Sequence, residues 1–250
     1  MKVPLTKTAP KLGTNVFNQE LDWWPSDSEE SFQRMMKDPV HRQYFAEQGW
    51  DRPGGITYKF NNIGFRGNDV EPGTPCLCAF GCSFTMGIGL PQNSVWPWVV
   101  GNALGLKVYN FSLGGVSADW CFRIAEYWIP KLNPRLAIFC APPPERTEAI
   151  VDEAGNARGY SAHEPIDDIF LKTWFTFDEN QRLNNVKNRL AFQGLCSQVG
   201  VPALVYDAHE WFGKSREEVG YARDYLHAGT KGHQYLANRI INDWNEIKHR

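Results

Sequence analysis

The sequence predicts an α/β protein built on a parallel sheet with helices on both faces. Three observations support this fold class. From Cys76 onward, short apolar runs alternate with segments of helical length and period. The run Cys76–Gly81 is apolar throughout, as expected of a strand buried on both faces. The alternation of strands and helices places parallel strands in one sheet between two helical layers.

The first 57 residues differ from the rest of the chain. They are polar, yet they contain Trp23, Trp24 and Trp50. Two short helices are expected here, over Asp27–Lys37 and Val40–Gln48, with Pro39 between them and Gly49 at the end. We therefore predict an N-terminal extension over residues 1–57 that packs on a main domain over residues 58–250.

The main domain begins with the strand Cys76–Gly81 and repeats the strand–helix pattern. The three later strands are expected at Lys107–Phe111, Leu136–Ala141 and Val201–Tyr206. The helices between them are expected at Ser94–Leu104, with Ser94 as cap and Gly105 as stop, and from Ser117 to a stop at Pro130. A third is marked by Leu183, Val186, Leu190 and Val199, with a stop at Gly200, and a final one begins at Thr230 and carries Leu236, Ile240, Trp244 and Ile247.

An aromatic insertion, Ile166–Phe177, lies between the third strand and the next helix. We interpret it as a satellite hydrophobic cluster, with a lid or a wall that binds an acyl chain as the alternative.

Composition and charge exclude several classes of binding partner for this protein. The chain holds 250 residues with a formal net charge of −2, which gives no attraction for nucleic acid or acidic lipid as a whole. The six cysteines form no pair of CxxC motifs, so we expect no metal site and a reducing compartment. The N-terminus lacks a signal-peptide stretch and no segment approaches the roughly 20 apolar residues of a membrane span. We expect a cytoplasmic protein, with phage-type release as the alternative.

A serine follows the first strand of the sheet, where ligands bind in folds of this class. Ligands of parallel α/β sheets lie beyond the carboxyl ends of the strands. Ser83 stands there, two residues after Gly81, whose lack of a side chain permits a sharp turn. The motif is not the G-x-S-x-G elbow of other hydrolases, because Thr85 occupies its last position. By itself Ser83 could equally be an ordinary turn residue.

An aspartate and a histidine precede the last helix. Asp224 and His227 stand three residues apart, a spacing that lets their side chains meet within one turn. A carboxylate in this place holds the tautomer of the imidazole and stabilises its protonated form. Imidazole exchanges a proton near neutral pH and suits a general base. The alternative is an ordinary exposed Asp–His pair. The additional presence of a serine after the first strand favours the catalytic interpretation, because the combination rarely arises by chance.

A glycine pair follows the second strand. In Asn110-Phe111-Ser112-Leu113-Gly114-Gly115, a glycine can bring its backbone N–H close to a substrate oxygen. Together with the N–H of Ser83, this forms the pair of donors that an oxyanion hole requires. An ordinary Gly-Gly turn is the alternative.

These blocks together resemble the SGNH hydrolases, also called GDSL-like lipases and acylhydrolases. The resemblance covers about residues 58–247 and rests on Gly81–Thr85, Asn110–Gly115, Asp224 with His227, Gly232-His233 and the lead-in Asn61–Gly67. It implies a three-layer α/β/α, flavodoxin-like fold. It also implies that Ser83 is the nucleophile, that Asp224 and His227 are its partners and that Gly115 is the oxyanion glycine.

The chain departs from the family pattern at two places. Cys82 replaces the usual aspartate of the first block, and we interpret it as a packed thiol. The family's oxyanion asparagine after the third strand is missing, because this chain reads Cys140-Ala141-Pro142-Pro143-Pro144-Glu145-Arg146. Loss of one such donor costs on the order of 100- to 1000-fold in rate. Arg146 is the candidate substitute, and Asn110 a second candidate contact to substrate or oxyanion. The alternative for Arg146 is an ion pair with Glu145 or Glu148.

We expect a serine ester hydrolase that removes a small acyl group by a Ser-His-Asp mechanism. Acetyl on a carbohydrate is favoured, because tryptophan is abundant and no long apolar segment suggests a lipid interface. The resemblance implies no cofactor. An acyltransferase using the same triad is the first alternative. The second is a non-catalytic carbohydrate-binding or virion component on the same fold.

Overall fold

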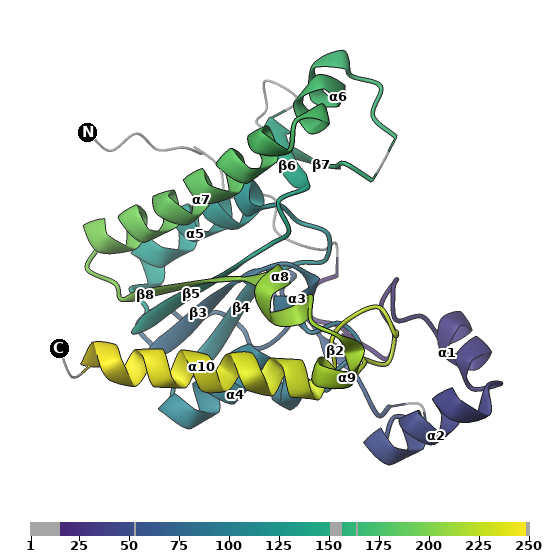
Figure 1. The fold of residues 1–250 in the computed structure, drawn as a ribbon. Helices are drawn as coiled ribbons and strands as arrows, with labels where there is room; N and C mark the ends of the chain where they lie inside the picture. The colour runs from purple at the N-terminus through teal and green to yellow at the C-terminus, as the bar shows by residue number, and fades with distance from the viewer. Residues whose placement is uncertain (1–15, 53, 151–156, 164, 249–250) are drawn as a thin grey trace.

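A four-stranded parallel sheet forms the centre of the protein. A computed structural model describes residues 16–52, 54–150, 157–163 and 165–248 (Figure 1). The strands are β3 (Cys76–Gly81), β4 (Lys107–Ser112), β5 (Leu136–Ala141) and β8 (Ala203–Asp207), arranged in the order β4-β3-β5-β8. All four predicted strands are confirmed, and so is the parallel sheet.

Two helices cover each face of this sheet, as Figure 1 shows. On one face lie α4 (Trp96–Leu104) and α10 (Thr230–Lys248), and on the other lie α5 (Ala118–Leu132) and α7 (Asp178–Gln198). Every residue of β3 and β5 is buried, which explains their uninterrupted apolar sequences. The predicted three-layer α/β/α fold is therefore confirmed.

The strand register brings the carboxyl ends of the strands together. Gly81 at the end of β3 lies opposite Ser112 of β4 on one side and Cys140 of β5 on the other. Ser83 stands two residues later, as the first residue of the short helix α3 (Ser83–Met86). The segments that follow three neighbouring strands thus start from one edge of the sheet.

The helix limits follow the predicted signals in part. The side chain of Ser117 accepts a hydrogen bond from the N–H of Trp120 and caps α5, and Gly105 ends α4 in a left-handed conformation. Ser94 is not a cap, because it belongs to the 3-10 turn η1 (Gln92–Ser94) and α4 begins after Val95. Pro130 does not stop α5, which continues through it to Leu132 and is capped by Asn133.

Helix α7 exists as predicted but turns a different face to the core. Leu183 and Leu190 are 60% and 62% exposed, whereas Phe192 and Cys196 are buried. Polar residues occupy the buried face beside them. Asn184 and Asn188 each donate a hydrogen bond to the carboxylate of Asp119 on α5. Burial of these amides is tolerated because each has a partner.

The N-terminal extension shares the core of the main domain. Strand β1 (Glu20–Leu21) pairs with β2 (Tyr58–Lys59), and the helices α1 (Glu29–Met35) and α2 (Pro39–Gln48) match the two predicted ones within a few residues. The buried side chains of Phe32, Phe45 and Trp50 belong to the same apolar cluster as residues of the sheet. In Figure 1 the extension lies on the side of the molecule where the strands end, near the loop before α10.

A hairpin that the sequence analysis did not predict projects beyond the sheet. Strands β6 (Arg146–Ile150) and β7 (Ala157–Ser161) form it, and α6 (Ile169–Thr176) lies beside it (Figure 1). The satellite-cluster interpretation of this insertion does not fit α6, because none of its residues is buried and Ile169 is 81% exposed.

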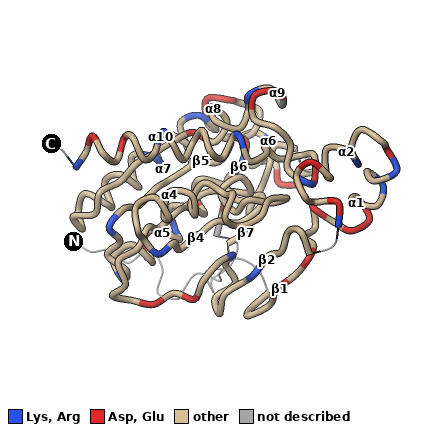
Figure 2. The backbone as a smooth tube through the Cα atoms, turned by 90° about the horizontal axis from the view of Figure 1, so that it is seen from below, with Lys and Arg blue, Asp and Glu red and all other residues tan. Residues whose placement is uncertain are grey.

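The short helices α8 (Ala208–Phe212) and α9 (Arg216–Val219) complete the fold between β8 and the last loop. Figure 2 shows positive and negative residues interspersed along the outer helices and loops. No helix within the described residues is both long enough and apolar enough to cross a bilayer.

Candidate active site

Ser83 lies at the end of β3, where the backbone leaves the sheet and enters α3. Gly81 is required there for close packing: a Cβ atom on it would lie 2.1 Å from Oγ1 of Thr85 and 2.9 Å from the carbonyl oxygen of Cys140. The glycine two residues before the serine therefore allows close approach and is not needed for an unusual φ. Cys82, between them, is fully buried, as expected of a packed thiol.

Asp224 and His227 form a hydrogen-bonded pair. Oδ2 of Asp224 lies 2.5 Å from Nδ1 of His227, and Oδ1 accepts hydrogen bonds of 3.0 Å from the backbone N–H groups of Leu226 and His227. The Asp224 side chain is fully buried and that of His227 is 13% exposed. The carboxylate is thus fully engaged, and its place beside Nδ1 favours the tautomer of His227 that carries a proton on Nδ1 and leaves the lone pair on Nε2.

The phenyl ring of Phe84 connects the serine segment to this pair. Phe84 follows Ser83, and its ring meets the imidazole of His227 edge to face, with 5.2 Å between ring centres. Within the described residues, neither Ser83 Oγ nor His227 Nε2 makes a hydrogen bond to a protein group.

The loop after β4 lies against Ser83. A Cβ atom on Gly114 would lie 4.0 Å from Cβ of Ser83, so Gly114 is the glycine that packs beside the serine. Gly115 follows with φ +79°, a conformation that favours glycine. In the described part of the chain, the N–H groups of Ser83 and Gly115 meet no acceptor. Both remain available for a ligand oxygen.

The Asn110 side chain is used within the protein. Its Nδ2 donates to the carbonyl oxygen of Thr85 at 2.9 Å, and its Oδ1 accepts from the hydroxyl of Ser112 at 2.6 Å. The residue is buried. Asn110 therefore holds α3 against β4, and little of its surface is left for a substrate.

Arg146 begins the β6 hairpin and reaches the loop that follows β4. Its Nη1 donates to the carbonyl oxygen of Val116 at 3.5 Å, one residue beyond Gly115. The alternative of an ion pair with Glu148 is wrong, because Glu148 forms a two-bond pair with Arg123. Among the described residues, no carboxylate pairs with Arg146.

His233 is buried behind His227. Its Nδ1 accepts a hydrogen bond from the backbone N–H of Trp96. Burial first, and then the neighbouring charges of His227 and Arg66, together lower the pKa of His233 to about 3. His233 is therefore neutral at ordinary pH and adds no charge that would oppose protonation of His227.

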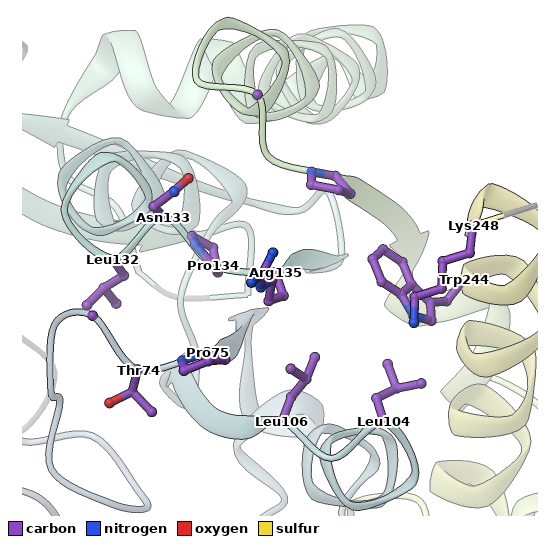
Figure 3. Close-up of a pocket in the computed structure, with 13 residues that line it drawn as sticks. Thr74, Pro75, Leu104, Leu106, Leu132, Asn133, Pro134, Arg135, Trp244 and Lys248 are labelled. Atoms are coloured by element: carbon purple, nitrogen blue, oxygen red, sulfur yellow. The ribbon is translucent and has the colours of Figure 1, made fainter. Parts of the chain in front are cut away.

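Two hollows differ in their relation to these residues. A pocket of about 770 Å³ lies at the amino ends of the strands, where Figure 3 shows Pro75, Leu106 and Arg135 around it, so it is remote from Ser83. A second hollow of about 890 Å³ lies between α2 and the loop of Asp224 and His227. Its walls include Tyr44, Tyr221 and Tyr225, and the rings of Tyr221 and Tyr225 stack with 4.5 Å between their centres.

Buried residues that hold the site together were missed by the sequence analysis. Arg66 donates hydrogen bonds to the carbonyl oxygens of Met86, Gly87, Leu90 and Thr57, and Arg223 pairs with Asp27. Arg66 falls in the lead-in stretch Asn61–Gly67, and Arg223 directly precedes Asp224. Their closeness to recognised motifs was the available signal, but an arginine in a sequence is expected to be exposed.

No protein-family model and no curated protein matches the chain. Solved structures similar to it include the psychrotrophic esterase EstA from Pseudoalteromonas sp., at 12% identity, 70% of this chain, 99% of that one and a TM-score of 0.39. Another is Est24, a carbohydrate acetylesterase from Sinorhizobium meliloti. It is 12% identical, the match covers 69% of this chain and 99% of that one, and the TM-score is 0.38. A third is a member of the lipolytic protein G-D-S-L family from Veillonella parvula. It is 11% identical, the match covers 66% of this chain and 96% of that one, and the TM-score is 0.34. The Veillonella protein carries the name of the family that the sequence resembles.

Proposed function

We propose that the protein is a serine ester hydrolase in which Ser83 is the nucleophile. The observation that carries this proposal is the buried Asp224–His227 pair, hydrogen-bonded at 2.5 Å and packed through Phe84 against the segment of Ser83. An aspartate that fixes the tautomer of a histidine beside a serine is the arrangement that activates a hydroxyl.

In the proposed mechanism, Ser83 Oγ attacks the carbonyl carbon of the ester while His227 Nε2 accepts its proton. The backbone N–H groups of Ser83 and Gly115 bind the oxyanion of the tetrahedral intermediate. His227 returns the proton to the leaving alcohol as the intermediate collapses to an acyl-serine. A water molecule then attacks the acyl carbon and gives a proton to His227. His227 returns that proton to Ser83 Oγ as the acyl–serine bond breaks, so the carboxylic acid leaves and the free serine is restored.

The substrate we favour is an acetyl ester of a carbohydrate. The hollow beside the Asp224–His227 turn supports this choice, because its three tyrosine rings and the side-chain amides of Gln48 and Gln234 suit a sugar ring. Arg146 stands at the loop of Gly115 with no carboxylate partner among the described residues. It is our candidate for a contact to substrate or oxyanion in place of the missing asparagine.

Hydrolysis of p-nitrophenyl acetate by the wild type and by Ser83→Ala tests the proposal. Activity that disappears in the variant supports it. Activity that is absent from both proteins, or equal in both, refutes it and favours the non-catalytic alternative. Acetylated sugars compared with long-chain esters then test the substrate, and a clear preference for long chains refutes the acetyl–carbohydrate choice. Acyl transfer to an added sugar alcohol would identify the transferase alternative.

A further inference from the structure

We propose that Asp27 of the N-terminal extension positions the Asp224–His227 pair relative to Ser83, acting through Arg223 and Tyr58. Asp27 is thus a positioning residue, and the extension is part of the active-site scaffold. The role rests on the proposed esterase function, because that function assigns the three residues being positioned.

The contact between Asp27 and Arg223 is a buried two-bond ion pair. Nε of Arg223 lies 2.9 Å from Oδ1 of Asp27, and Nη2 lies 2.8 Å from Oδ2. The side chains are 1% and 0% exposed. Nη2 also donates to the carbonyl oxygen of Asp22, and the guanidinium lies 4.2 Å from the ring centre of Trp23. Four contacts from the extension therefore hold the residue that directly precedes Asp224.

A second arm connects Asp27 to the segment that follows Ser83. The hydroxyl of Tyr58 donates to Oδ2 of Asp27 at 2.5 Å and accepts from the backbone N–H of Gly89 at 2.7 Å. The carbonyl oxygen of Gly89 in turn accepts from the N–H of Arg223 at 2.9 Å. Asp27, Tyr58, Gly89 and Arg223 therefore form a closed ring of hydrogen bonds.

This ring joins the two halves of the candidate site. Gly89 lies three residues after the end of α3, the helix that begins with Ser83. Arg66 holds the same segment, with hydrogen bonds to Met86, Gly87 and Leu90, while its guanidinium lies 4.5 Å from the ring centre of Tyr58. The serine segment and the Asp224–His227 loop thus share one buried polar anchor, and that anchor is Asp27.

The competing view is that Asp27 merely attaches the extension to the main domain. A buried ion pair adds little net stability compared with an apolar pair, but removal of one partner is strongly destabilising. A lower free energy of unfolding in an Asp27 variant would therefore be expected for both roles and would not distinguish them. The discriminating quantity is the turnover of the folded enzyme, since small displacements of catalytic groups lower kcat more than KM.

The test uses the Asp27→Asn variant of the 250-residue chain, which keeps the size of the side chain and removes its charge. With p-nitrophenyl acetate, below the unfolding temperature of each protein, we expect kcat to fall about 10- to 100-fold and KM to stay within about threefold. The matched control is Trp50→Phe, a buried position of the extension whose ring packs on Tyr44. We expect it to lower stability and leave kcat within about twofold. A kcat for Asp27→Asn within twofold of the wild type overturns the proposal.

Two further measurements cover the other outcomes. If Asp27→Asn does not fold, Tyr58→Phe replaces it, because that change removes only the hydroxyl between Asp27 and Gly89; an unchanged kcat then overturns the proposal. If the wild type shows no Ser83-dependent hydrolysis, the esterase function fails, and the positioning is read by NMR instead. The far-downfield resonance of the proton between His227 Nδ1 and Asp224 should shift or broaden in Asp27→Asn and not in Trp50→Phe. An unchanged resonance also overturns the proposal.

Discussion

The ring of Phe84 packs edge to face against the imidazole of His227, with 5.2 Å between their centres. On its other side Phe84 stacks on Phe212 at 4.9 Å, with the two rings nearly parallel. His227 is therefore held by packing from the serine segment and by the hydrogen bond that its Nδ1 makes to the carboxylate of Asp224. The rotamer of the candidate base depends on both, because an imidazole has freedom to turn when either is lost.

Asp224→Asn should almost abolish hydrolysis and leave the fold intact. The amide can still accept the two backbone hydrogen bonds at Oδ1, but its NH2 group would face Nδ1 of His227 and favour the wrong tautomer. We expect kcat to fall by about 10³- to 10⁴-fold. The matched control is Asp243→Asn on α10, whose carboxylate binds Arg239 and Tyr206. Initial-rate kinetics on both variants check this, and a loss below tenfold for Asp224→Asn would contradict the assigned role.

Gly89→Ala should separate the serine segment from the Asp224 loop. A Cβ atom here would lie 2.9 Å from Cβ of Ala222 and 3.0 Å from the backbone N of Arg223, and φ is +74°. Gly73 has a similar φ of +85°, with nothing within 4 Å of its Cβ position. Gly73→Ala therefore measures the cost of the conformation alone, about 1 kcal/mol.

We expect Gly89→Ala to lower the free energy of unfolding by about 1–3 kcal/mol more than Gly73→Ala does, because a tight backbone contact must open. Only Gly89→Ala should also reduce kcat. Urea unfolding and esterase rates on the two variants provide the comparison. An equal loss of unfolding free energy in the two variants would contradict the prediction, because it would mean that the contact at Gly89 can open at no energetic cost.

His233 should make the protein sensitive to acid. Its pKa is about 3 in the folded state, because of burial first and the nearby charges second, against an ordinary value of 6.5. Between these pH values His233 is protonated in the unfolded chain but not in the folded chain. The free energy of unfolding therefore falls as the pH drops from 6.5 toward 3. At pH 4.5 the loss reaches on the order of 2–3 kcal/mol.

His233→Asn retains an acceptor for the N–H of Trp96 and removes this titration. Its stability should decline less steeply than that of the wild type between pH 6.5 and 4.5, while the acidic residues contribute equally to both proteins. Urea unfolding at several pH values measures the difference. Parallel curves for the two proteins would show that His233 takes up its proton without unfolding.

Two positions on α7 should respond in opposite ways. Leu190 is 62% exposed, so Leu190→Glu should change the free energy of unfolding by no more than about 0.5 kcal/mol. Phe192, two residues later, is fully buried against Phe80 and Phe139, so Phe192→Ala should cost about 3–5 kcal/mol. Thermal or urea unfolding checks the pair. A large loss for Leu190→Glu would show that this face of α7 is covered in solution.

The sequence alone identified the sheet and the places where polar residues follow its strands. Runs such as Cys76–Gly81 and Leu136–Ala141 are apolar without interruption, and such a local pattern can be recognised without knowing what the strand packs against.

The sequence pattern predicted the wrong buried face for α7, because the partners of that face lie far away along the chain. Asn184 and Asn188 are buried because Asp119, 65 and 69 residues away, accepts their hydrogen bonds, and no local period carries that information.

The order of Ser83, Asp224 and His227 along the chain was readable from motifs, and the pairing of Asp224 with His227 followed from their spacing. The anchor of that pair was decided by tertiary structure alone. Asp27 and Arg223 are 196 positions apart, and each by itself is a charged residue that belongs on the surface. Only when the fold excludes water around both does their attraction fix a geometry. This is why the sequence indicated the candidate catalytic residues, while only the structure showed the buried ion pair beside them.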